Sequence, residues 1–304
     1  MADSIFLNYK FRCSSLGHLM TNLVTSDDIK KIDDEIKVYL LEKANGINAN
    51  GNKVKWTDNK QIALDKLLAK KNNPDELPTG AKSHLDDVFR SQFWGRRRTL
   101  NNKYLDKGLI CEEDALELLS LVDDTFYIKN SDQLENDYIC GMPDNRQDII
   151  RDTKANWDLD SYDKAELTSL YEWQIKGYSY LDNKTKGELC YCLVNNPYHQ
   201  LVNEKQRLYY AMGTPSDDDE KWVKSISQIE RNMIFDIPKF KEHYPNYDFV
   251  NTTLDFTIPA IYRVKKFNVE LFPEDIKNIK SRVLLAREYL MKKELEVLTL
   301  INSK

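Results

Sequence analysis

The sequence of 304 residues contains no apolar run of membrane-spanning length and no signal-peptide apolar region near its start. We therefore expect a soluble, cytoplasmic protein without a membrane partner. Cysteines are few, and their odd number of five and their scattered positions exclude a disulfide framework. The four histidines show no metal-ligand spacing, so we interpret them as ordinary surface or capping residues.

The net charge of −5 excludes a uniformly basic nucleic-acid-binding protein. A local basic segment is nevertheless present, because Arg90–Lys107 contains six basic residues against one acidic residue, interleaved with aromatic residues. Such side chains can follow phosphates and stack on bases, so Arg96, Arg97 and Arg98 are candidate DNA-binding residues. A solvated basic loop has the same composition, and this alternative stays open.

The segment Tyr138–Lys154 carries the most informative pattern in the chain. Two short runs of β-forming residues flank a cluster of turn-forming residues, which predicts a hairpin. Side chains alternate along a strand, so Asp152 and Lys154 share one face while Thr153 points the other way. Asp144, at the turn end of the first strand, can reach the same end of the sheet. Two carboxylates and an amine then converge where Mg²⁺ or Mn²⁺ would bind, although a cross-strand ion pair is the plain alternative.

Two further elements are predicted downstream. Lys164–Leu181 has the composition of a helix with an apolar stripe, and Gln174 and Tyr178 lie four apart on one helical face. Tyr178 is equally consistent with packing on a sheet, whereas the Gln174 amide needs a partner if it is buried. Gly187–Pro197 is apolar on both faces, which is typical of a strand inside a sheet. These elements predict an α/β fold with a small central mixed β-sheet flanked by helices.

A cluster of acidic residues lies upstream, after Gly108, which we expect to end the preceding segment. Glu112, Glu113 and Asp114 open a predicted helix. Complementarity with the helix dipole explains such a cluster without any function. The alternative is that one of these carboxylates points toward the sheet as a third metal ligand.

In this order, Gly-x-x-x-Glu-x-x-Ala, Gly-x-Pro-Asp, Asp-x-Lys and Gln-x-x-x-Tyr resemble the motifs of the PD-(D/E)XK nuclease superfamily. The likeness is strongest to the phage-type recombination exonucleases, the group of the lambda exonuclease, YqaJ and RecB-nuclease-like proteins. The family's catalytic positions then fall on Glu112, Asp144, Asp152, Lys154, Gln174 and Tyr178.

The resemblance implies a restriction-endonuclease-like core and metal-dependent hydrolysis of phosphodiester bonds. Asp144, Asp152 and Glu112 would bind one or two Mg²⁺ or Mn²⁺ ions. Lys154 would orient or deprotonate the attacking water, or stabilise charge on the phosphate, and Gln174 would hydrogen-bond nearby.

Three positions bear on how closely the pattern is followed. Asp152 stands where many relatives have glutamate, and Asn145 stands where a glycine often follows the preceding aspartate. Neither change removes a metal ligand. Some relatives hold an iron–sulfur cluster, but no cysteine follows Cys192, so no such cluster is expected here.

The segment Phe11–Thr21 resembles the opening helix of the phage members, where basic and hydroxyl side chains lie near the DNA end. Arg12 and Ser14 are therefore candidate DNA-binding residues, with a 5′-phosphate as the group they would contact. A surface arginine and a helix-capping serine are the alternative.

We expect a single nuclease domain across residues 1–304. Residues 1–105 would form a mainly helical N-terminal insertion, residues 106–200 the catalytic core, and residues 201–304 an extension with strands and a long C-terminal helix.

The expected function is that of a Mg²⁺-dependent exonuclease acting on linear duplex DNA in phage-type recombination or DNA processing. The resemblance implies a bacterial or phage-infected cell, with a single-strand annealing recombinase and further copies of the chain as partners. Two alternatives stay open: a structure-specific or restriction-like endonuclease, and a catalytically silent DNA-binding or assembly protein on the same fold.

Overall fold

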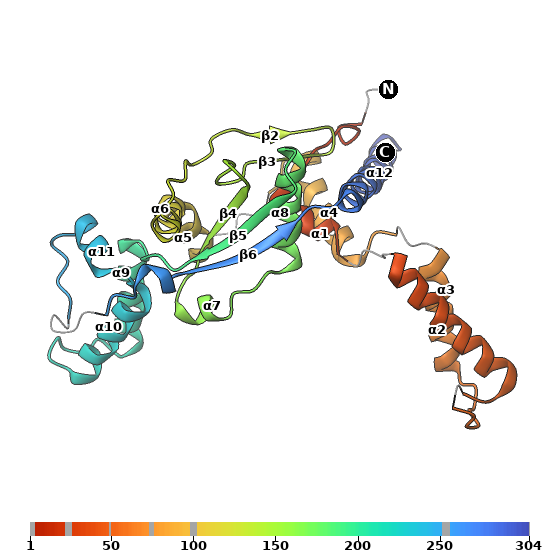
Figure 1. The fold of residues 1–304 in the computed structure, drawn as a ribbon, viewed down its shortest axis with the longest axis horizontal. Coiled ribbons are helices and arrows are strands. Elements are labelled where there is room, and N and C mark those ends of the chain that lie inside the picture. The colour runs from red at the N-terminus through yellow and green to blue at the C-terminus, as the bar shows by residue number, and fades with distance from the viewer. Residues whose placement is uncertain are drawn as a thin grey trace. The chain divides into compact units, whose positions relative to one another are not determined.

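The computed structural model describes residues 4–21, 26–48, 50–72, 76–97, 102–250 and 256–303 (Figure 1). The chain divides into two compact units. The first unit comprises residues 1–7, 18–95 and 280–304, and the second comprises residues 8–17 and 96–279. All six predicted catalytic residues belong to the second unit.

The main sheet of the second unit has three strands in the order β4-β5-β6. β4 (Ile150–Ala155) runs parallel to β5 (Lys186–Cys192), and β6 (Val264–Glu270) is antiparallel to β5 (Figure 1). The sheet is therefore mixed, as predicted, and the apolar run expected to form a buried strand is its central strand. β4 lies at the edge, so the outer side of its backbone is available to other partners.

A second three-stranded sheet has the order β1-β3-β2. β3 (Ile139–Gly141) is parallel to β1 (Phe11–Arg12) and antiparallel to β2 (Leu134–Glu135). The predicted hairpin between β3 and β4 is therefore wrong: these strands belong to different sheets, and an antiparallel bridge links Asn145 to Arg151 between them. Each strand finds its parallel partner in a segment distant in sequence, which a local pattern does not reveal.

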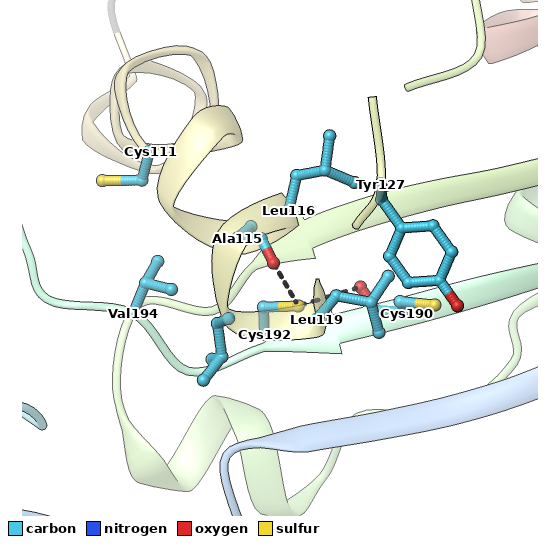
Figure 2. Packing of buried hydrophobic residues seen from close by; sticks show 9 residues of the cluster. Cys111, Ala115, Leu116, Leu119, Tyr127, Cys190, Cys192 and Val194 are labelled. Atoms are coloured by element: carbon cyan, nitrogen blue, oxygen red, sulfur yellow. Dashed lines mark hydrogen bonds between the residues drawn. The ribbon is translucent and has the colours of Figure 1, made fainter. Parts of the chain in front are cut away.

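Helices cover both faces of the mixed sheet. α6 (Glu112–Asp123) packs on Cys190 and Cys192 of β5 in a buried apolar cluster, with the Cys192 thiol directed at a carbonyl of α6 (Figure 2). Tyr191 instead contacts a tyrosine of α8 (Ser169–Leu181), with ring centroids 6.2 Å apart. Because successive side chains of a strand point to opposite faces, α6 and α8 lie on opposite sides of β5.

Two helix boundaries differ from the prediction. α5 (Lys103–Ile110) contains Gly108 in its interior, so this glycine does not end the preceding segment. α8 does not begin at Lys164, because Thr168 caps it: the Thr168 side chain accepts a hydrogen bond from a backbone N–H of the first turn. The intervening residues include a short separate helix, α7 (Leu159–Asp163).

The second unit also contains a helical extension, formed by α9 (Tyr198–Ala211), α10 (Glu220–Met233), α11 (Ile237–His243) and the short 3-10 helix η1 (Ala260–Tyr262). α10 begins after Asp219, whose side chain accepts hydrogen bonds from two N–H groups of the first turn.

The first unit is helical, as predicted for the N-terminal part of the chain. It contains α2 (Ser26–Asn45), α3 (Asp58–Asn72), α4 (Thr79–Phe93) and most of α12 (Pro273–Asn302). α2 and α3 pack through Ile32, Ile36 and Leu64. No helix within the described ranges is long and apolar enough to cross a membrane.

Candidate active site

Asp144 lies in the loop between β3 and β4, and its carboxylate is bound to the outer edge of β4. Oδ2 accepts hydrogen bonds from the backbone N–H of Thr153 at 2.6 Å and from the Thr153 hydroxyl at 2.7 Å. Asn130 holds the same loop, because its N–H donates to the Asp144 carbonyl at 2.7 Å and its side-chain amide donates to the Pro143 carbonyl at 3.0 Å. Sequence reasoning missed Thr153 and Asn130, since no spacing rule relates either residue to Asp144.

Asp152 and Lys154 share one face of β4, as alternation predicts, and they form an ion pair. Asp152 is 3% exposed, and Nε2 of Gln174 on α8 donates to its Oδ1 at 3.1 Å. The same nitrogen donates to the Tyr178 hydroxyl at 3.1 Å. The structure therefore brings together four of the predicted catalytic residues, and the buried amide has the partners that its position requires.

Burial dominates the electrostatics of this cluster. Desolvation raises the pKa of Asp152 to about 6, an effect that Lys154 opposes and Asp144 reinforces. Desolvation also raises the pKa of Asp144, although the hydrogen bonds from Thr153 oppose it. Burial lowers the pKa of Lys154, but the charge and hydrogen bond of Asp152, together with Asp144 and Tyr171, raise it overall. Lys154 therefore keeps its proton at neutral pH, while the two aspartates repel each other.

Two glycines allow the elements behind the site to approach closely. A Cβ atom at Gly141 of β3 would lie 2.5 Å from Cε1 of Tyr178. A Cβ atom at Gly177 of α8 would lie 2.9 Å from Sγ of Cys13, the buried first residue of α1 (Cys13–Leu19). A side chain at either glycine would move α8, which carries the Gln174 amide bound to Asp152.

Glu112, the first residue of α6, is less exposed than its neighbour Glu113: their side chains are 27% and 78% exposed. Desolvation is the main cause of the raised pKa of Asp144. The charge of Glu112 raises this pKa further, so the two carboxylates interact. Oε1 of Glu112 lies 3.6 Å from Nζ of Lys129. Oε1 of Glu113 lies 3.5 Å from the same Lys129 nitrogen, so the two glutamates differ in burial and not in this contact.

The donor atoms of this cluster fit a hard divalent cation. Oδ2 of Asp152 is buried and accepts no hydrogen bond from the described residues, its contact being the Lys154 ammonium. Carboxylate oxygens are the ligands that Mg²⁺ and Mn²⁺ prefer, and a cation would relieve the repulsion between Asp144 and Asp152. In the parts of the chain that the structure describes, no three His, Cys, Asp or Glu side chains are grouped closely enough to hold a metal ion. A cation bound at this cluster would contact the carboxylates of Asp144 and Asp152.

Arg12, the last residue of β1, is exposed and pairs in register with Cys140 of β3, the strand that leads to the Asp144 loop. Ser14 is exposed in the first turn of α1. The hydroxyl of Ser15, not that of Ser14, donates to the Arg12 carbonyl, at 3.1 Å.

The basic segment contributes two described candidates, since Arg96 and Arg97 are exposed and Arg98 lies outside the described residues. Desolvation raises the pKa of Tyr9, and the charges of Arg12 and Arg97 both oppose this rise. Both arginines therefore interact with the same tyrosine.

No protein-family model and no curated protein matches the sequence. Among solved structures, a phage-related exonuclease from Haemophilus somnus 129PT is similar over 95% of this chain and 97% of its own, with a TM-score of 0.57 and 20% identity. An alkaline exonuclease (LHK-Exo) from Laribacter hongkongensis matches 74% of this chain and 87% of its own, with a TM-score of 0.45 and 9% identity. The first likeness shows that this chain has the fold of that phage-related exonuclease, and it confirms the predicted α/β fold.

Proposed function

We propose that this protein is a Mg²⁺- or Mn²⁺-dependent exonuclease that hydrolyses phosphodiester bonds of linear duplex DNA. The observation that carries the proposal is the convergence of Asp144, Asp152, Lys154 and Gln174 around edge strand β4, on a fold similar to that of a phage-related exonuclease. A fold alone does not determine an activity, so the side-chain cluster is the stronger support.

Asp144 and Asp152 would bind one or two cations. Glu112 is the proposed further ligand, although the structure does not group it with the two aspartates as a three-carboxylate site, so it would have to leave Lys129 to reach the cation. The bound cation would polarise the phosphate, lower the pKa of the attacking water and neutralise the leaving oxygen. Lys154 holds its proton beside Asp152. Its ammonium group therefore stabilises negative charge on the phosphate rather than removing a proton from water.

Gln174 and Tyr178, both on α8, position the carboxylate of Asp152. The Gln174 amide fixes one oxygen of Asp152, and the Tyr178 hydroxyl accepts from the same amide nitrogen. A carboxylate held in this way has a defined orientation before substrate arrives, which lowers the cost of reorganisation during the reaction.

The proposed substrate is DNA with a free end. Arg12 and Ser14 are the proposed contacts for a terminal 5′-phosphate, and Arg96 and Arg97 are proposed to follow the DNA backbone. The proposal includes a role in phage-type recombination in the cytoplasm of a bacterial cell, with a single-strand annealing recombinase and further copies of the chain as partners. The motif resemblance supports this part.

The test is to incubate linear and covalently closed circular duplex DNA with the protein and Mg²⁺ and to follow product length over time. We expect linear duplex to shorten progressively and closed circles to persist. Cleavage of closed circles would instead identify an endonuclease. No cleavage of either substrate with Mg²⁺ or Mn²⁺ would indicate a binding protein without turnover, and full activity in EDTA would contradict metal dependence.

A further inference from the structure

Thr153, the middle residue of the Asp-x-Lys triplet, makes two hydrogen bonds to one atom. Its backbone N–H and its hydroxyl both donate to Oδ2 of Asp144, at 2.6 and 2.7 Å. Thr153 is 7% exposed, so water competes little for these bonds. Among the described residues, no group donates a hydrogen bond to Oδ1 of Asp144.

This asymmetry has a chemical consequence for the Asp144 carboxylate. Two donors on Oδ2 fix the plane of the carboxylate, because they restrict rotation about the Cβ–Cγ bond from one side. The second oxygen then keeps its lone pairs for another ligand. Partners that orient a metal-binding carboxylate in this way typically raise metal affinity by about ten- to a hundredfold.

We propose that Thr153 is a positioning residue for the cation site: its hydroxyl holds Oδ2 of Asp144 so that Oδ1 faces the cation. This inference rests on the proposed function. The backbone N–H of Thr153 would by itself join the Asp144 loop to the edge of β4. The hydroxyl adds a second donor at the same oxygen, and an apolar β-branched residue would fit the strand equally well without it.

The test compares Thr153→Val with Thr153→Ser. Valine keeps the shape of the side chain and the backbone N–H but lacks the hydroxyl, whereas serine keeps the hydroxyl. Mn²⁺ binding to the full chain is measured by calorimetry or by electron paramagnetic resonance, without DNA, and the Mg²⁺ concentration for half-maximal cleavage is measured separately. Unfolding curves in EDTA check that each variant folds, and Thr153→Ala gives the same comparison if the valine variant does not fold.

We expect Thr153→Val to bind Mn²⁺ about tenfold more weakly than wild type and Thr153→Ser to bind within about threefold of wild type, following the usual contribution of such partners. The Mg²⁺ requirement for cleavage should shift in the same order. Equal Mn²⁺ affinity of wild type and Thr153→Val, or equal weakening in the valine and serine variants, would overturn the inference while leaving the proposed function intact. A wild-type protein that binds no Mn²⁺ would overturn the proposed cation site itself and this inference with it.

Discussion

Position 152 combines two features that are costly for the folded chain with a third that partly offsets them. Asp152 is buried, it lies near a second carboxylate, and its charge is partly compensated by Lys154. A structural ion pair would not need the second carboxylate, because Asp144 only adds repulsion. The arrangement therefore supports the proposed cation site more than it supports a contribution of these residues to stability.

The buried carboxylate predicts a pH-dependent effect of Asp152→Asn in metal-free protein. Burial raises the folded-state pKa of Asp152 to about 6, from an ordinary value of 3.8. Below about pH 4 the side chain is protonated in both the folded and the unfolded chain, whereas above about pH 6 the folded protein carries an ionisation cost of about 3 kcal/mol. The stability of the variant relative to wild type should therefore rise by about 2–3 kcal/mol between pH 4 and pH 8, measured by urea unfolding in EDTA. Cleavage should be lost in the variant.

Asp148→Asn provides the control with the opposite sign. The side-chain hydrogen bond from Arg151 lowers the pKa of Asp148, so this carboxylate stabilises the fold above its unfolded pKa and loses that effect as the pH falls. The Asn variant should then become relatively less stable as the pH rises. A stability difference for Asp152→Asn that does not change with pH would contradict the raised pKa.

At the scale of elements, local patterns predicted what depends on neighbouring residues. The central strand β5, the helix α6 and the face shared by Asp152 and Lys154 follow from periodicity and alternation. The pairing of the strands could not be predicted from local patterns, because β3 and β4 take partners from distant segments. The predicted hairpin was therefore wrong. The contact of Thr153 with Asp144 exists only once β4 has become an edge strand. Asn130 reaches the same loop from the segment before β2, so its contact does not follow from a local pattern either.

Lys107, in helix α5, lies outside the cluster of candidate catalytic residues, and we expect its replacement to destabilise the fold strongly. Lys107 is fully buried, and its ammonium donates to the carbonyls of Asn156 and Val194 and to the side chain of Asn196. It thus joins the segments that follow β4 and β5. Lys107→Met should lower the free energy of unfolding by about 2–4 kcal/mol, because several buried acceptors lose their hydrogen-bond donor. Burial lowers the pKa of Lys107 to about 7, so the prediction rests on the lost hydrogen bonds and not on a full charge. Urea unfolding at neutral pH measures this loss.

Lys103→Met is the matched control in the same helix. The Lys103 side chain is 37% exposed and pairs with Glu204 at 2.7 Å. A partly exposed pair of this kind contributes about 1 kcal/mol, so the control should lose much less stability than Lys107→Met. Equal losses in the two variants would show that the Lys107 contacts have no special role.

At the scale of the whole molecule, the net charge of −5 requires that any contact with DNA be local. The described candidates are Arg12, Arg96 and Arg97, all exposed in the second unit. The fold likeness spans 95% of the chain, so both units have counterparts in the phage-related exonuclease. The predicted boundaries at residues 105 and 200 stay a prediction, as do the roles of the three arginines.

How the protein distinguishes a DNA end can be tested at Arg12. A terminal 5′-phosphate carries more negative charge than an internal diester, so an arginine that contacts the end should matter most when that phosphate is present. We expect Arg12→Ala to slow digestion of 5′-phosphorylated linear duplex by about ten- to a hundredfold, the equivalent of about 1.5–3 kcal/mol, with a much smaller effect on 5′-hydroxyl duplex. Arg96→Ala is the control, because a contact with the DNA backbone should slow both substrates to the same extent and weaken at high salt. Equal slowing of the two substrates by Arg12→Ala would assign Arg12 to the backbone, and no slowing of either would remove it from the DNA-binding surface.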